Sequence, residues 1–249
     1  MVNSLQKYRL KKITSLPRPA ALIQLHPSPT MPTPPTVPTP PAPTVPTPAL
    51  SKWSRTEDVR DAFPEGCAEL KQFTTIITGP TTGIGAATTI ALAAVGGRVV
   101  LAARSQQKAE ALMSEIVASV PDAGPMAWIE LDLSSLESVE AFADKFAVAS
   151  DAGGWPLLKC VVCNAGMFNM AGKFRASADG FEETFAVNHL GHFLLTKLLM
   201  PRLVAAAPSR VVLVSSGSHF GPLTTKEVAN RVALRELASP DEAARAKYE

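Results

Sequence analysis

Three glycines follow an apolar segment of the chain, and their spacing suits phosphate binding. Gly79, Gly83 and Gly85 come directly after the β-type run 73–78. A glycine accepts positive φ and lets backbone approach a phosphate, while the N–H groups and positive dipole end of a following helix attract the anion. The spacing therefore predicts a strand-to-helix turn that binds a nucleotide. Glycine-rich turns also occur without a ligand, so other segments must decide between the two readings.

Polar residues near this turn indicate which nucleotide it binds. Thr81 and Thr82 offer hydroxyls or N–H groups to a pyrophosphate, and Ile84 lies between the last two glycines. Arg104 comes nineteen residues after Gly85, where NAD-specific folds tend to place an acid for the ribose 2′-hydroxyl. A cation there suggests a 2′-phosphate, so NADP(H) is expected rather than NAD(H). The alternative is a solvated arginine at a strand end.

Such a turn needs a parallel sheet behind it, and the hydrophobic pattern provides one. Helices are expected at 84–95, 105–120, 135–150 and 181–205, and strands at 73–78, 98–103, 126–131, 157–163 and 210–215. Apolar strands separated by helices imply right-handed crossovers. The fold class is α/β, a doubly wound parallel sheet of the Rossmann type, with strand order 3-2-1-4-5.

The composition divides the chain into 1–50 and 51–249. Residues 1–25 are basic and free of acids, as in organelle-targeting peptides. The expected location is a mitochondrion or a plastid, and the alternative is the cytoplasm. Residues 27–48 contain 11 prolines and read as a disordered, extended linker. Two short helices, 225–237 and a second one from residue 239, are expected after the fifth strand.

Charge and hydropathy argue against nucleic acid as a partner and against a membrane-spanning segment. Residues 1–56 hold seven of the 24 Lys and Arg residues and none of the 22 Asp and Glu residues. The remainder is mildly acidic and lacks the clustered basic face that nucleic acid requires. No run of 18 apolar residues exists, so no transmembrane segment is expected.

The cysteines and histidines do not indicate a metal site. Three cysteines are too few for a disulfide framework in 249 residues. Cys160 and Cys163 lie three apart on an expected strand, which places their side chains on opposite faces of the sheet. His189 and His192 share a helical face but have no acid or cysteine at suitable spacing. We interpret the two cysteines as plain buried residues and the two histidines as packing and hydrogen-bonding residues.

Five motifs in sequence order resemble the short-chain dehydrogenase/reductase family. They are Thr78-Gly79-x-x-x-Gly83-Ile84-Gly85, Asp132-Leu133, Asn164-Ala165-Gly166, Asn188 and Ser215-Ser216. The segment 188–196 is most similar to the retinol-dehydrogenase-like subgroup. The resemblance covers about residues 73–218.

The resemblance implies a role for each motif. Asp132, followed by Leu133, would hydrogen-bond near the adenine, and the backbone of Asn164, Ala165 and Gly166 would approach the ribose. Ser216 would hold the substrate oxygen, and Asn188 would kink its helix to support a proton-relay water. The alternatives are turn or capping residues for Asp132, Asn164 and Asn188, and a strand-end serine for Ser216. The implied reaction moves hydride between nicotinamide and a small carbonyl or alcohol substrate.

The catalytic Tyr-x-x-x-Lys of this family is missing where it is expected. Tyr8 lies in the basic leader, and Tyr248 is followed by a single residue. A nearby lysine would lower the pKa of such a tyrosine from about 10 toward the working range. We expect an NADP(H)-dependent oxidoreductase represented by an incomplete chain. The alternative is a non-catalytic dinucleotide-binding or interaction protein, and a bare sheet edge after the fifth strand predicts a homo-oligomer or aggregation.

Overall fold

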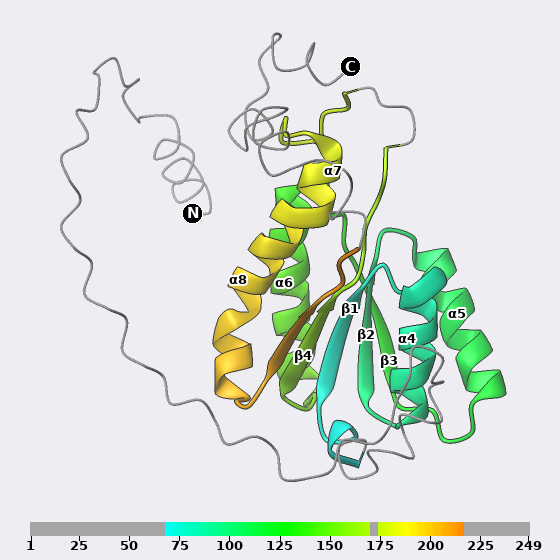
Figure 1. Ribbon diagram of the computed structural model, residues 1–249. Coiled ribbons are helices and arrows are strands. Elements are labelled where there is room, and N and C mark those ends of the chain that lie inside the picture. The colour runs from blue at the N-terminus through cyan, green and yellow to red at the C-terminus, as the bar shows by residue number, and fades with distance from the viewer. Residues whose placement is uncertain (1–67, 170–173, 217–249) are drawn as a thin grey trace, which may run out of the picture. The chain divides into compact units, whose positions relative to one another are not determined.

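A parallel sheet organises the computed structural model, which describes residues 68–169 and 174–216. Within these ranges five strands pair in the order β3-β2-β1-β4-β5, all parallel (Figure 1). The strands are β1 (Thr74–Thr78), β2 (Arg98–Ala103), β3 (Met126–Glu130), β4 (Leu158–Cys163) and β5 (Arg210–Leu213). The predicted α/β class and strand order are confirmed.

Helices cover both faces of this sheet, as right-handed crossovers require. Figure 1 shows α4 (Gly83–Ala94) and α5 (Gln106–Ser119) on one side of the sheet. On the other side lie α6 (Leu136–Ala152) and α8 (Gly191–Ala205). Helices α5 and α6 begin where a serine accepts a backbone N–H, Ser105 from Lys108 and Ser135 from Ser138.

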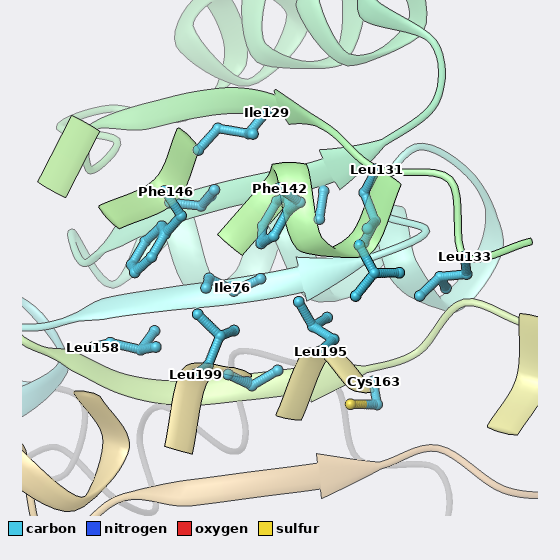
Figure 2. Close-up of a cluster of buried hydrophobic side chains, with 14 of the residues drawn as sticks. Ile76, Ile129, Leu131, Leu133, Phe142, Phe146, Leu158, Cys163, Leu195 and Leu199 are labelled. Atoms are coloured by element: carbon cyan, nitrogen blue, oxygen red, sulfur yellow. The ribbon is translucent and has the colours of Figure 1, made fainter. Parts of the chain in front are cut away.

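The core on the α6 and α8 side contains the largest buried side chains. Phe142 and Phe146 of α6 are fully buried and stack with ring centroids 6.5 Å apart. Figure 2 shows them with Ile76 of β1 and with Leu195 and Leu199 of α8. These contacts hold α8 against the sheet, and α8 carries His192, which belongs to the site described below.

The two strand cysteines lie on opposite faces of the sheet, as predicted. Cys163 belongs to the cluster under α6 and α8, whereas Cys160 packs against the cluster under α4 and α5. Burial raises the pKa of both thiols. A separation of three on a strand therefore keeps these thiols apart.

The helix expected at 181–205 differs from the single helix of the prediction. It consists of α7 (Glu183–Phe185), the π-helix η1 (Ala186–Leu190) and α8. The Glu182 carboxylate accepts N–H groups of the first turn at 2.7–2.9 Å, which starts the helix at residue 183. Directly after η1, Gly191 lies so close to the loop after β3 that a Cβ on it would be 2.6 Å from the Leu133 carbonyl oxygen.

Several predictions fall on residues outside the described ranges. These are the basic leader, the proline-rich linker, both tyrosines and the two short helices after the fifth strand. In the part of the chain that the structure describes, no helix is both long and apolar enough to cross a membrane.

Candidate functional site

A cavity of about 510 Å³ lies at the carboxyl ends of the strands. This edge is where ligands bind in open α/β sheets, because the connections after the strands diverge there. Most of the site residues predicted from the sequence line this cavity. They are Gly79, Thr81, Thr82, Ile84, Gly85, Arg104, Asp132, Leu133, Asn164, Ala165 and Gly166. Gly83, Asn188 and Ser216 are not among its lining residues. The contacts of these residues with a cofactor remain a prediction.

The glycine-rich turn forms one wall, and its backbone leaves no room for a side chain at Gly79 or at Gly85. Gly79 has φ +60°, and a Cβ on it would lie 2.9 Å from the Ala165 Cα. A Cβ on Gly85 would lie 2.0 Å from the Gly79 carbonyl oxygen and 2.6 Å from Asn164 Nδ2. Gly83 has φ +54° and opens helix α4. The turn thus presents bare backbone and a helix N-terminus to the cavity, which fits a pyrophosphate.

Asn164 fastens the turn after β4 to the glycine-rich turn. Its Nδ2 donates to the carbonyl oxygens of Thr78 at 2.9 Å and Gly79 at 3.1 Å. Its backbone N–H donates to the Thr78 hydroxyl at 3.0 Å, and that of Ala165 does so at 2.9 Å. The two turns therefore form one hydrogen-bonded unit along the cavity wall.

A buried histidine of α8 reaches the same hydroxyl. His192 Nε2 lies 2.8 Å from Thr78 Oγ1, and its Nδ1 lies 3.3 Å from the carbonyl oxygen of Asn188. Burial lowers the pKa of His192. The histidine was interpreted from the sequence as a packing and hydrogen-bonding residue, and its buried position and contacts agree with that interpretation.

Asn188 lies within η1, and its side chain contacts backbone rather than the cavity. Its Oδ1 accepts the N–H of Met167 at 2.8 Å, and its Nδ2 donates to the Met167 carbonyl oxygen at 2.9 Å. The paired amide contacts hold the chain just after Gly166 against the π-helix. The role in a proton relay remains a prediction.

Asp132 shapes the loop after β3. Its Oδ1 accepts the N–H and the hydroxyl of Ser134, at 2.9 and 2.7 Å. This is the turn role considered from the sequence, and Asp132 lines the cavity as well. The aspartate thus stabilises its own loop at the cavity's edge.

Two cations converge at the end of β2. Arg104 and Lys108 are both exposed and both line the cavity, together with Ser105. Lys108 was not predicted from the sequence. It lies in the first turn of α5, four residues after Arg104, and this closeness in the chain could have pointed to it. Met167, Glu183, Val187 and Val214 are further lining residues that sequence reasoning missed.

The remaining predicted residues lie elsewhere. Ser216 is exposed after β5. His189 stacks between Phe185 and Phe193, at centroid distances of 5.4 and 6.4 Å. Among the described residues, no group of three or more His, Cys, Asp or Glu side chains is placed to hold a metal.

Comparison with known proteins identifies the family. The family described as short chain dehydrogenase matches residues 74–228. Dehydrogenase/reductase SDR family member 13 of Bos taurus is 42% identical over 154 residues, which are 62% of this chain and 38% of that protein. Retinol dehydrogenase 12 of Bos taurus is 44% identical over 144 residues, 58% of this chain and 43% of that protein. The chain spans about two-fifths of the length of these curated relatives.

A solved structure shows the same relationship. A metagenomic short-chain oxidoreductase, in complex with NADP, is 30% identical with a TM-score of 0.52. The match covers 62% of this chain and 67% of that one. With its glycine-rich turn, its strand order and its matched region, the chain belongs to the short-chain dehydrogenase/reductase family of oxidoreductases.

Proposed function

We propose that this chain binds NADP(H) and forms the cofactor-binding part of an oxidoreductase acting on a carbonyl or alcohol substrate. One observation carries the proposal, namely that bare glycine backbone, a helix N-terminus and two cations line the same cavity. The glycine turn supplies N–H groups for the pyrophosphate, and Asn164 to Gly166 supply backbone for the nicotinamide-side ribose. Asp132 and Leu133 line the same cavity and are proposed to contact the adenine side.

The preference for NADP(H) over NAD(H) rests on Arg104 and Lys108. Both follow β2, where an acid would favour the ribose 2′-hydroxyl and where a cation favours a 2′-phosphate. Ser105 lies between them and adds a hydroxyl. The NADP in the metagenomic relative supports the same choice.

The bound nicotinamide would supply the hydride that this reaction transfers. Ser216, just after β5, is proposed to hold the substrate oxygen, and Asn188 to keep the helix geometry needed for proton transfer. The relatives named retinol dehydrogenases support an alcohol or aldehyde as the substrate class. A general acid with a pKa near the working pH is required in addition.

The second candidate is a dinucleotide-binding protein without catalysis. It keeps the cofactor cavity, whereas the tyrosines of this sequence, Tyr8 and Tyr248, lie outside the described residues. The family's proton donor would be expected after β5. Both candidates predict cofactor binding, so turnover has to separate them.

The test measures binding first and turnover second. Titration of the purified 249-residue chain with NADPH and NADH, followed by nucleotide fluorescence, should show tighter binding of NADPH. Equal affinities would contradict the NADP(H) assignment, and no binding of either would contradict the proposed function. NADPH oxidation with a panel of aldehydes and ketones would then exclude the non-catalytic candidate, whereas binding without turnover would favour it.

The basic leader supports a proposed organellar location, in a mitochondrion or a plastid, with the cytoplasm as the alternative. A fluorescent protein fused after residue 50 tests this location. Diffuse fluorescence throughout the cytoplasm would contradict an organellar address.

A further inference from the structure

The Thr78 hydroxyl lies at the centre of four polar contacts. The N–H groups of Asn164 and Ala165 approach its oxygen at 3.0 and 2.9 Å, and both can only donate. His192 Nε2 lies 2.8 Å away, and the carbonyl oxygen of Val162 lies 3.4 Å away. The hydroxyl has two acceptor lone pairs and one proton. The Asn164 N–H is shared between this oxygen and the carbonyl oxygen of Val162, which lies 3.0 Å from the Asn164 nitrogen. Both backbone N–H groups approach the acceptor side of the hydroxyl, so its proton goes to His192 or to Val162.

The histidine contacts decide where that proton goes. His192 Nδ1 lies 3.3 Å from the carbonyl oxygen of Asn188, which can only accept. Nδ1 therefore carries the ring proton, and Nε2 offers a lone pair. The Thr78 hydroxyl then donates to Nε2 at the shorter of its two distances, and every group in the cluster is matched.

The other neutral tautomer and the charged ring both fit poorly. A proton on Nε2 would bring a third donor to Thr78 Oγ1. The hydroxyl proton would then be left with the Val162 carbonyl oxygen, which is more distant at 3.4 Å and already accepts the Asn164 N–H. In the other neutral form, the bare Nδ1 would also face the lone pairs of the Asn188 carbonyl. His192 is only 5% exposed, so water does not relieve either conflict.

We propose that neutral His192, protonated at Nδ1, is a positioning residue for the dinucleotide. By taking the Thr78 proton it directs both hydroxyl lone pairs toward Asn164 and Ala165. These amides begin the turn that lines the cavity and touches Gly79. The same ring binds the carbonyl of Asn188, whose side chain holds Met167. His192 thus connects the π-helix to both turns of the cofactor wall. This inference rests on the proposed function, because it assigns the residue that orders that same wall.

His189 offers a matched comparison three residues earlier. It is exposed and stacked between two phenylalanines, and it does not line the cavity. A positive charge on His189 repels one on His192 and so contributes to the lowered pKa of His192. The same substitutions at the two histidines therefore separate an effect on the wall from a general effect on this helix.

The first experiment measures the dissociation constant for NADPH in full-length variants. His192→Phe keeps a ring but loses the acceptor, and we expect roughly fivefold weaker binding, as for one lost hydrogen bond. His192→Gln can place its amide oxygen where Nε2 was, and it should restore the affinity to within roughly twofold. His189→Phe and His189→Gln should bind like the wild type. His192→Asn keeps a donor near Asn188 but is too short to reach Thr78, so it replaces the phenylalanine variant if that variant does not fold.

A double-mutant cycle tests the route through Thr78. Thr78→Val removes the hydroxyl that His192 orients, and Thr78→Ser keeps it. We expect Thr78→Val to weaken NADPH binding, and His192→Phe to add less than twofold in that background. Full additivity of the two effects would overturn the coupling.

A spectroscopic measurement tests the tautomer without any cofactor. Long-range proton–nitrogen correlation spectra of ¹⁵N-histidine protein should show His192 protonated at Nδ1 and bare at Nε2. The His192→Gln variant assigns the signals among the four histidines of the chain. A protonated Nε2 overturns the inference, and so does wild-type affinity in His192→Phe. If the wild-type chain binds no dinucleotide, the proposed function fails instead, and the positioning role fails with it.

Discussion

Gly85 approaches Gly79 so closely that a β-carbon on Gly85 would lie 2.0 Å from the Gly79 carbonyl oxygen. The obstacle is backbone, and Asn164 Nδ2 stands 2.6 Å away on the other side, so neither can move aside freely. We expect Gly85→Ala to lower the free energy of unfolding by about 1–3 kcal/mol. The displaced turn should also weaken NADPH binding at least roughly tenfold, or about 1.4 kcal/mol. Calorimetry and fluorescence titration measure the two effects.

Gly154→Ala is the control for this substitution. Gly154 has φ +57°, has open space around its missing Cβ and does not line the cavity. The variant should lose about 1–2 kcal/mol through its backbone conformation and keep its NADPH affinity. Wild-type affinity in Gly85→Ala would contradict the proposed role of the turn.

Arg104→Ala should weaken NADPH binding and leave NADH binding unchanged. A charge-assisted hydrogen bond contributes about 1.5–3 kcal/mol, so the loss should be roughly 10- to 100-fold. Lys108→Ala should act in the same direction. Gln107, exposed between them and outside the cavity lining, provides the control variant Gln107→Ala. An equal loss for both nucleotides would indicate that Arg104 does not contact a 2′-phosphate.

Asn188→Ala should release the backbone at Met167. Both hydrogen bonds between the Asn188 side chain and Met167 would be lost, at about 0.5–1.5 kcal/mol each. We expect faster amide hydrogen exchange at Met167 and weaker NADPH binding. Asn188→Asp keeps the acceptor for the N–H and should protect that amide partly. Unchanged exchange in Asn188→Ala would show that other contacts hold this segment.

Stability should fall in mild acid because of His192. Burial lowers its pKa from 6.5, so below pH 6.5 the unfolded chain binds a proton that the folded chain refuses. The contribution of neutral, buried His192 to the free energy of unfolding is therefore complete above pH 6.5. It is lost as the pH falls from there toward the lowered pKa, at up to about 1.4 kcal/mol per pH unit. Denaturant unfolding between pH 7 and pH 5 measures this slope. His192→Gln should flatten it relative to His189→Gln.

Strand β5 predicts self-association of the chain. Within the described ranges it pairs with β4 alone, and Leu213 is 70% exposed. An exposed edge strand offers unpaired backbone groups to another chain, and a charge at the edge opposes such pairing. We expect concentration-dependent oligomers in light scattering, reduced by Leu213→Lys. A wild-type chain that stays monomeric at all concentrations would contradict this expectation.

Within the described residues, local patterns in the sequence predicted the elements and their order, except that η1 divides the helix expected at 181–205. Alternating apolar strands and helices predicted the order 3-2-1-4-5, and the observed bounds lie within a few residues of the predicted ones. The glycine spacing located the turn after β1, and the cation after β2 is the basis of the prediction that a 2′-phosphate binds there. These signals are readable because each depends on residues that are neighbours in the chain.

Contacts between distant segments decided the rest. The contact between Thr78 and His192 joins residues 114 positions apart, and that between Asn188 and Met167 joins residues 21 apart. The π-helix at η1 was not predicted from the sequence either, and the proposed tautomer of His192 depends partly on its contact with Thr78. A sequence shows which groups can donate or accept hydrogen bonds, but the packing of α8 on the sheet determines which of them meet.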